Sequence, residues 1–114
     1  MPLPNKYRIT GKKEIDGIFK NGRTVKGVFL FIRILKNQKE YSRFAFIIPI
    51  KHIPLAVDRN KIRRMFSGDI AKLRLPQLGY DIIAVVYKKA EKSRFKELVI
   101  ELNALLLKIQ NQNI

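Results

Sequence analysis

Residues 80–87 (YDIIAVVY) constrain the fold more strongly than any other part of the sequence, because almost all of their side chains are apolar. A strand with apolar residues on both of its faces is typical of the interior of a sheet, where other elements cover it. Pro76, shortly before this segment, ends any helix that precedes it. We therefore expect residues 80–87 to be the central strand of a sheet.

Two other segments, residues 28–35 and 43–50, have the β-branched and aromatic composition of strands. One face of the first segment is wholly aliphatic: Val28, Leu30, Ile32 and Ile34. Its other face carries side chains that suit a contact surface: Phe29, Phe31 and Arg33. Because the connector between the two segments is short and polar, we expect them to form a hairpin.

Apolar residues recur with helical spacing in three places. A short helix near the N-terminus is expected to have Thr10 as its N-cap. A second helix covers residues 59–73 and contains Gly68, which costs about 1 kcal/mol relative to Ala and predicts a weakened or bent second half. The third helix covers residues 95–109, with Ser93 as its N-cap.

The expected element order is α-β-β-α-β-α, an α+β sandwich of helices against a small mixed sheet. The chain has 114 residues and no repeat or linker, so we expect a single domain over 1–114, with 1–6 and 110–114 as flexible ends. It has no cysteine, which excludes disulfides and thiolate metal sites. We find no signal-peptide pattern and no apolar run of about 20 residues, and therefore expect a cytoplasmic protein without a membrane partner.

Charge gives the first indication of function. The chain carries 24 Lys and Arg residues against 9 Asp and Glu residues, a net charge of +15. Such an excess opposes compaction by self-repulsion, and therefore indicates a polyanionic partner. Nucleic acid is the leading candidate, and an anionic membrane surface is the second. Since 46% of the residues are apolar, we expect a folded chain and not a disordered basic tail.

The basic stretch at residues 57–64 (VDRNKIRR) is the strongest candidate binding surface. On a helical wheel, Arg59 and Arg63 form a stripe beside the apolar side that anchors the helix. Asn60 and Arg64 flank this stripe. Guanidinium groups bridge phosphate oxygens and stack on bases, and an amide suits a ribose hydroxyl or a base edge. These cations have no acid four residues away, so a salt-bridged solvent face is the less favoured interpretation.

This stretch and the loop before it resemble the protein component of bacterial ribonuclease P. That family has a strand ending in basic residues, a small turn, and then Ala-Val-x-Arg-Asn-basic-apolar-basic-Arg opening a helix, which residues 50–54 and 56–64 match. Residues 8–23 resemble its first helix, with a Phe-basic-x-Gly exit, and residues 80–86 resemble one of its strands. The resemblance covers roughly residues 6–107, and the Arg-Asn helix is its most specific part.

The resemblance implies an α-β-β-β-α-β-α fold, with one short strand more than the order given above. It also implies a left-handed β-α-β crossover around the basic helix, against the general rule. The family's protein assists a catalytic RNA in removing the 5′ leader from precursor tRNA, as a subunit of an endoribonuclease. The implied partners are ribonuclease P RNA and precursor tRNA, with no obligate protein partner. The implied cofactor is Mg²⁺, held through the RNA subunit and not by a protein motif.

The resemblance also assigns site residues, position by position. The RNA-binding loop and helix correspond to one set: Lys51, His52, Arg59, Asn60, Lys61, Arg63 and Arg64. The cleft that holds the single-stranded leader corresponds to a second set: Phe19 and Phe31, with Arg33 on the strand face of Phe31. Aromatic rings beside cations are what single-stranded nucleic acid requires. Four positions depart from the family pattern: Ile15, His52, Pro54 and Ser67.

The sequence indicates no catalytic residue of the protein's own. The nine acids form no paired-carboxylate motif, and neither a Gly-rich phosphate loop nor a nucleophile motif with His52 is present. A stand-alone metal nuclease is therefore disfavoured. A non-enzymatic structural RNA-binding protein, of the ribosomal or RNA-chaperone type, remains the alternative. Charge and aromatic content fit both functions, and the Arg-Asn helix after the Lys51 loop favours ribonuclease P.

Overall fold

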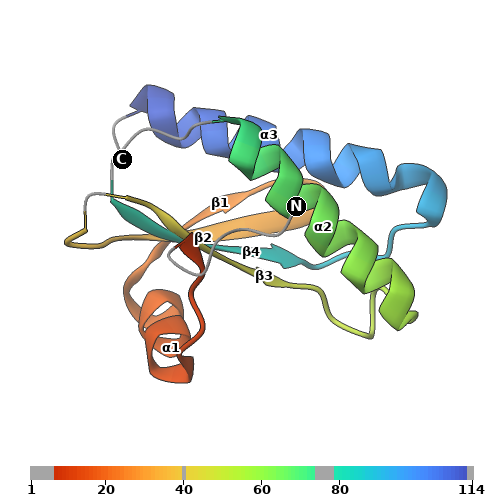
Figure 1. Ribbon diagram of the computed structural model, residues 1–114, viewed down its shortest axis with the longest axis horizontal. Helices are drawn as coiled ribbons and strands as arrows, with labels where there is room; N and C mark the ends of the chain where they lie inside the picture. Colours follow the sequence, from red (N-terminus) through yellow and green to blue (C-terminus); the bar gives the residue numbers. More distant parts are fainter. Residues whose placement is uncertain (1–6, 40, 74–78, 113–114) are drawn as a thin grey trace.

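The chain forms three α-helices and four strands in the residues that the structure describes. The computed structural model describes residues 7–39, 41–73 and 79–112 (Figure 1). The elements in these residues are α1 (Lys12–Asn21), β1 (Arg23–Lys26), β2 (Leu30–Lys36), β3 (Arg43–Ile47), α2 (Ala56–Leu73), β4 (Tyr80–Val86), the 3₁₀ turn η2 (Lys92–Arg94) and α3 (Phe95–Gln112). The α+β class is confirmed. The additional short strand that the resemblance implied is β1.

Strand β4 occupies the interior of the sheet, whose strand order is β1-β2-β4-β3. It pairs antiparallel with β2 and parallel with β3, and all of its residues except Val85 are buried. The central position predicted for residues 80–87 is therefore confirmed. The hairpin predicted between residues 28–35 and 43–50 is wrong, because β4 lies between β2 and β3, and β2 forms its hairpin with β1. The apolar character of β4 on both faces explains why it takes the interior position.

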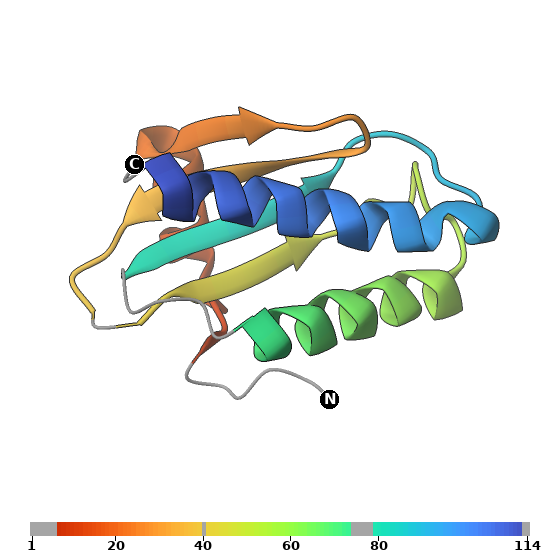
Figure 2. The same cartoon turned by 90° about the horizontal axis from the view of Figure 1, so that it is seen from above.

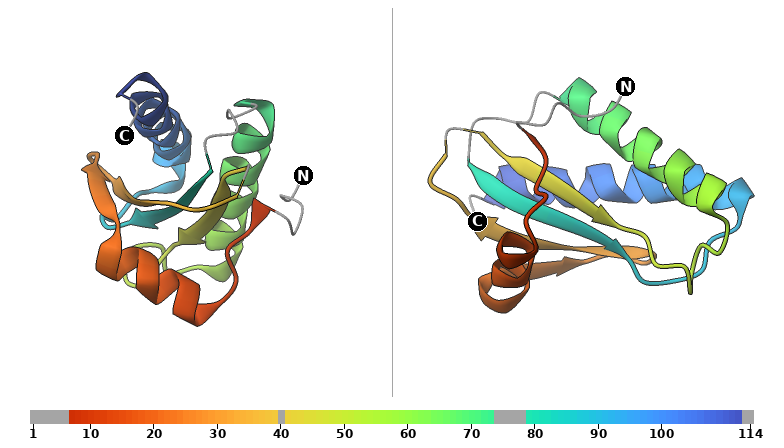
Figure 3. Two further views of the ribbon diagram at one scale, coloured as in Figure 1. Left: turned by 90° about the vertical axis from the view of Figure 1, so that its left-hand side faces the viewer. Right: turned by 60° about the horizontal axis from the view of Figure 1, so that its bottom comes forward.

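Helices cover the two faces of the sheet unequally. α2 and α3 lie over one face, and α1 lies under one end of the other face (Figures 1 and 3). The main core lies between the sheet and the two long helices, and its fully buried side chains include Leu30, Ile32, Ile62, Phe66, Leu98 and Leu102. A smaller cluster lies on the α1 side and contains Ile9, Ile18 and Ile83. In the described structure, α1 is the only helix on its face, which leaves part of that face available for a ligand.

Strand β2 has one aliphatic face and one face with Phe31 and Arg33, as predicted, but Val28 and Phe29 lie before the strand and do not follow this division. Three aliphatic side chains face the main core, each 3% exposed or less: Leu30, Ile32 and Ile34. Val28 lies before the strand and is 61% exposed. Phe29 packs against the main core, with the Arg94 guanidinium 5.1 Å from its ring centroid. Of the three residues predicted for the contact face, Phe31 and Arg33 lie on the face toward α1.

The connection from β3 through α2 to β4 is left-handed. Figure 2 views the sheet from the side of α2 and α3, so that α2 lies in front of the strands. β3 and β4 are parallel, and when they are turned to point upward, the chain passes from β3 to β4 toward the left. Crossovers of this kind are right-handed in about 98% of cases. The structure thus has the unusual hand that the resemblance implied.

The starts of the helices differ from the sequence predictions. α1 begins after Gly11 without a side-chain cap, so Thr10 does not cap it. The turn η2 leads directly into α3, and Ser93 lies inside this turn. α2 continues through Gly68 as one helix from Ala56 to Leu73.

The expected flexible ends fall mostly outside the described residues. This applies to residues 1–6 and 113–114, whereas residues 110–112 form the end of α3. None of the described helices has the length and apolar character needed to cross a membrane.

Candidate nucleic-acid interface

Arg59 fastens the loop at residues 50–54 to the start of α2. Its Nη1 atom donates hydrogen bonds to the carbonyl oxygens of Ile53 (2.9 Å) and Pro54 (2.8 Å). Ile53 is 1% exposed and anchors the loop in the core, while Lys51 is exposed. Arg59, predicted to bind RNA, thus also shapes the loop that presents Lys51. Within the described structure, its Nε and Nη2 atoms have no hydrogen-bond partner and are left for a ligand.

The other basic residues of α2 carry charge that the described protein residues do not neutralise. Lys61 and Arg64 are exposed and Arg63 is half-buried. None of them forms an ion pair with a described acid. Arg63 has one weak contact, 3.4 Å from its Nη1 atom to Oδ1 of the exposed Asn60. This arrangement fits a polyanionic ligand, because unpaired like charges on one helix destabilise it.

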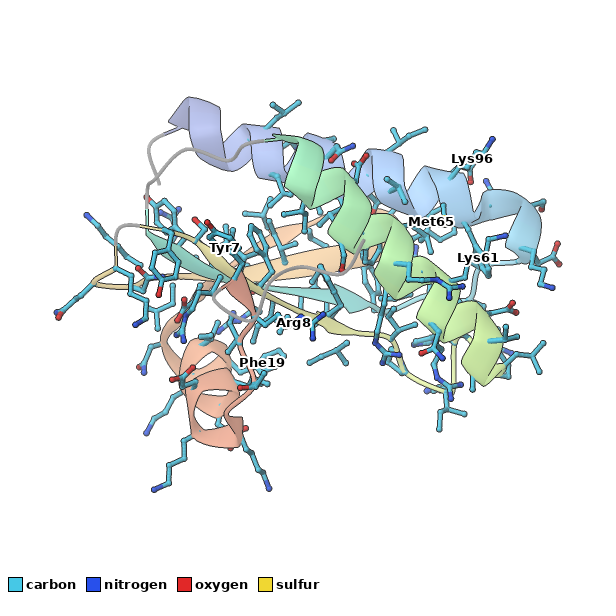
Figure 4. All side chains as sticks on the ribbon, viewed as in Figure 1. Tyr7, Arg8, Phe19, Lys61, Met65 and Lys96 are labelled. Carbon is cyan, nitrogen blue, oxygen red and sulfur yellow. The ribbon has the colours of Figure 1, made fainter. Side chains whose placement is uncertain are left out.

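The predicted RNA-binding side chains lie around α2 and do not share one stripe. Arg63 and Arg64 line a cavity beside β3. Lys61 and Met65 project from the side of α2 that is nearer to α3, from which Lys96 also projects (Figure 4). The helix therefore presents cations on two flanks.

His52 follows Lys51 in the loop and is half-buried. Its Nδ1 atom is buried without a hydrogen-bond partner among the described residues.

A cleft lies between the end of α1 and the open face of β1 and β2, and we call it the α1 cleft. Its volume is about 460 Å³, and it is lined by Phe19, Thr24, Lys26, Phe31, Arg33 and Tyr87. The structure brings together all three side chains predicted for such a cleft. The strand register explains this, since Thr24 pairs with Arg33 and Lys26 pairs with Phe31, so that these side chains share one face.

Sequence reasoning missed three lining residues of the α1 cleft: Thr24, Lys26 and Tyr87. The first two lie on β1, a strand of four residues that has no clear apolar alternation. Tyr87 directly follows β4, and a signal for it was available, because an aromatic residue ended the apolar segment 80–87.

Polar contacts hold the walls of the α1 cleft in place. Arg33 donates from Nη1 to Oγ1 of Thr24 (2.5 Å) and from Nη2 to the carbonyl oxygen of Phe19, which ties α1 to β1. The Nε atom of Arg33 is buried without a partner in the described structure. Tyr87 donates its hydroxyl hydrogen to the carbonyl oxygen of Gly27.

Aromatic rings and cations alternate across the α1 cleft. The rings of Phe31 and Tyr87 have centroids 5.8 Å apart. Lys26 Nζ lies 5.3 Å from the centroid of the Tyr87 ring, and Lys88 Nζ lies 5.6 Å from it. Phe19 is 36% exposed, so part of its side chain is accessible to a ligand in this cleft. Such a surface offers stacking to bases and positive charge to phosphates.

Glu101 of α3 supports the turn between β1 and β2 from behind. Its Oε1 atom accepts hydrogen bonds from the backbone N–H groups of Phe29 and Leu30, both at 2.9 Å. At Gly27 a Cβ would lie only 2.2 Å from this oxygen, so a larger residue there would force the Glu101 side chain to move. Because Lys26 immediately precedes this turn, Glu101 contributes to the position of one wall of the cleft.

Protein-borne metal chemistry has no evident site in the described residues. They contain no group of three or more His, Cys, Asp and Glu side chains that could hold a metal ion. The surfaces described above are suited to binding nucleic acid.

Comparison with known proteins gives a consistent result. The model of the ribonuclease P family matches residues 3–110. A ribonuclease P protein component from Fusobacterium nucleatum is 35% identical over 96 residues, covering 79% of this chain and 85% of that protein. One from Syntrophomonas wolfei is 32% identical over 95 residues, covering 82% and 79%.

Solved structures agree with the sequence comparisons. The RNase P protein of Staphylococcus aureus has a TM-score of 0.77 at 25% identity, with 91% of this chain and 94% of that chain covered. The RNase P protein of Thermotoga maritima has the same fold, with a TM-score of 0.73 at 24% identity and coverage of 90% and 96%. The family match over residues 3–110 shows that this chain belongs to the ribonuclease P protein family.

Proposed function

We propose that this chain is the protein subunit of ribonuclease P and assists the removal of the 5′ leader from precursor tRNA. The observation that carries the proposal is the α1 cleft, in which Phe19, Phe31 and Tyr87 lie beside Lys26 and Arg33. The leader would lie in this cleft as a single strand. The structural RNA-binding alternative is not favoured, because the chain belongs to a family named for the processing enzyme.

Several features support leader binding in the α1 cleft. Aromatic rings stack on any base, so that a cleft of this kind accepts leaders of differing sequence. The cations beside the rings neutralise backbone phosphates and make binding dependent on salt. Among the described elements, α1 is the only helix on this sheet face, and the leader would enter beside it.

The loop at residues 50–54 and α2 would contact the RNA subunit. Their cations lack acidic partners in the described residues, and α2 lies on the sheet face opposite α1 (Figure 1). One molecule would thus bind the catalytic RNA and the leader through different surfaces. The predicted contacts remain Lys51, His52, Arg59, Asn60, Lys61, Arg63 and Arg64.

Catalysis in this proposal belongs to the RNA subunit. Mg²⁺ would be held by RNA phosphates, and the protein would act by neutralising phosphate charge and holding the leader. Basic residues replace some of the cations that a folded RNA otherwise requires, so less Mg²⁺ would suffice. A cytoplasmic location is part of the same proposal.

Reconstitution tests the proposal directly. Cleavage of a 5′-leader precursor tRNA by a bacterial ribonuclease P RNA is measured at limiting Mg²⁺, with and without the 114-residue chain. We expect cleavage only when both components are present, and a smaller effect on a precursor with a single-nucleotide leader. An unrelated protein of similar positive charge is the control. Equal stimulation by that control, or none by this chain, would contradict the proposal.

A further inference from the structure

A second cavity lies along the outer edge of β3, and we call it the edge cavity. Its volume is about 350 Å³. Polar walls come from α2 and from the segment before α1: Arg63, Arg64 and Ser67, and Arg8 and Thr10. Its apolar part includes Ile9, Ile15, Phe46 and Ile47. It shares no lining residue with the α1 cleft.

Three guanidinium groups meet at the edge cavity without a carboxylate to neutralise them. Arg8 and Arg64 are exposed and Arg63 is half-buried, and none of them pairs with an acid of the described structure. The acid on α1 that points toward β3, Glu14, is bound to Arg43 at 3.0 Å. The cavity therefore attracts an anion, and guanidinium groups favour phosphate in particular.

Strand β3 leaves backbone groups open at the same edge. The N–H of Ile9 donates to the carbonyl oxygen of Phe44 at 2.9 Å, as part of an isolated parallel bridge between Arg8 and Phe44. Alternate residues of a parallel strand direct their backbone groups to the same side, so those of Phe46 point to this outer edge too. No described segment pairs with Phe46 there. An adjacent donor and acceptor are what the edge of a nucleobase requires.

We propose that the edge cavity binds one unpaired nucleotide of an RNA. The base lies on the apolar part of the cavity with its edge at the backbone of Phe46, and the phosphate lies at Arg63 and Arg64. The volume is at the lower end of the range of about 300–1,000 Å³ that is usual for small-ligand sites. The inference rests on the proposed function, and it specifies what α2 recognises: an unstacked nucleotide and not only a duplex backbone. A peptide strand added to β3 would use the same backbone groups, but it would not require three arginines.

Titration with mononucleotides tests the proposal on the full chain. ¹H–¹⁵N spectra are recorded with AMP, CMP, GMP and UMP. Two further probes are adenosine, which lacks the phosphate, and ribose 5-phosphate, which lacks the base. We expect saturable shifts of the amides of Phe46, Arg64 and Ser67 with at least one nucleotide, at lower concentration than with either half-molecule. Shifts confined to the α1 cleft, or an equal response to ribose 5-phosphate, would overturn the proposal. So would shifts at β3 with an apolar pentapeptide and none with nucleotides, an outcome that would indicate strand addition.

Matched variants separate the site from bulk charge. Arg64→Gln is expected to weaken nucleotide binding about fivefold or more, because it removes a charge-assisted hydrogen bond. Lys96→Gln removes the same charge from α3 and is expected to change binding less than about twofold. Equal losses in both variants would overturn the proposal.

Filling the edge cavity gives a second test. Ser67→Leu places a larger side chain in its wall and is expected to abolish the nucleotide shifts. Gly68→Ala is the control, because a Cβ at this neighbouring position meets no atom within 4 Å. Circular dichroism checks folding, and if Ser67→Leu is unfolded, Arg64→Gln alone decides the outcome.

The reconstituted cleavage reaction distinguishes this proposal from the proposed function. If this chain stimulates leader cleavage while nucleotides leave the edge cavity unaffected, only the nucleotide site is refuted. If nucleotides bind the edge cavity and cleavage is not stimulated, the site exists and the proposed function is refuted.

Discussion

Arg43 connects α1, β3 and β4 at the level of single residues. Its Nε and Nη2 atoms donate to the two carboxylate oxygens of Asp81 at 2.9 and 2.7 Å, and its Nη1 atom lies 3.0 Å from Oε2 of Glu14. Asn37 donates a further hydrogen bond to Asp81 at 2.8 Å. The hydrogen bonds that Arg43 donates to Asp81 are the main reason why the pKa of Arg43 is raised, and burial opposes the shift. A raised pKa means that the contribution of the charged Arg43 guanidinium is lost only when the pH rises past an already alkaline value.

Replacing Asp81 with Ala is therefore expected to destabilise the protein by about 3 kcal/mol, because the largely buried Arg43 loses its partner. Urea denaturation at neutral pH measures this loss. Glu97→Ala is the matched control, since its ion pair with Arg94 is about half exposed. It should cost at most about 1 kcal/mol. Similar losses in the two variants would show that the Arg43 pair is no more than a surface contact.

Phe19 allows a test of leader binding with little effect on folding, because its side chain is 36% exposed. Phe19→Ala is expected to weaken leader-dependent binding of precursor tRNA by about 1–3 kcal/mol, the usual contribution of one stacked base. The measurement compares affinities for precursors with long and single-nucleotide leaders. Ile100→Ala, at a 66% exposed position on α3, should leave both affinities unchanged. A loss of the same size for both precursors would exclude leader stacking on Phe19.

At the scale of elements, the contact between α3 and the β1–β2 turn leads to a prediction about coupling. Gly27→Ala should destabilise the protein by up to about 2 kcal/mol, because its methyl group displaces the Glu101 carboxylate from the two backbone N–H groups that it accepts from. Glu101→Ala should cost about 2 kcal/mol, since two backbone N–H groups lose an acceptor. The double variant Gly27→Ala/Glu101→Ala should lose less stability than the two single losses added together, because the methyl group introduced at position 27 no longer meets a Glu101 side chain. Additive losses in thermal denaturation would mean that the turn does not rest on Glu101.

Arg63 and Arg59 of α2 are expected to differ in their effect on the free protein. Arg63→Ala should reduce the slope of RNA-subunit affinity against salt by about 1 and leave the melting temperature nearly unchanged. Arg59→Ala should also reduce the stability of the free protein, by about 1 kcal/mol, because two loop carbonyls lose their donor. Salt-dependent binding and thermal denaturation measure the two effects. An unchanged slope in both variants would show that neither side chain neutralises phosphate.

The sequence was sufficient to predict elements with a regular apolar pattern. The central strand, the buried side of α2 and the α3 helix were recognised because their buried residues give a regular apolar pattern in the sequence. The prediction of a hairpin between β2 and β3 was wrong, because the short distance between these strands along the chain cannot reveal that β4 is inserted between them in the sheet. β1 was missed by pattern alone, since four largely exposed residues carry no periodic signal. In the α1 cleft, Phe19 and Phe31 followed from the resemblance to the ribonuclease P family, and Arg33 followed because strand alternation places it on the face of Phe31. The aromatic character of Tyr87 was visible in the sequence, but its place in the cleft depends on the sheet order.

The whole molecule places its two proposed binding surfaces on opposite sides of one sheet. α1 with its cleft lies on one face, and α2 lies on the other (Figure 3). Sites that share no partners and lie far apart contribute additively to binding, usually within about 0.5 kcal/mol. Phe19→Ala should therefore weaken leader-dependent binding of precursor tRNA by the same amount with and without Arg63→Ala, when enough protein is present to saturate the RNA subunit. Strong non-additivity in equilibrium binding would mean that the sheet transmits strain between its faces.

The insertion of β4 between β2 and β3 also determines when this protein can fold. During synthesis, β2 and β3 leave the ribosome well before residues 80–86, and their edges lack the strand that belongs between them. Pairing of segments that are distant along the chain is slow, because a long loop must close first. Until β4 arrives, the local β2–β3 hairpin is the competing arrangement, and the nascent chain has to avoid it or undo it. The strand that completes the sheet therefore also ends the period in which this chain is most open to misfolding.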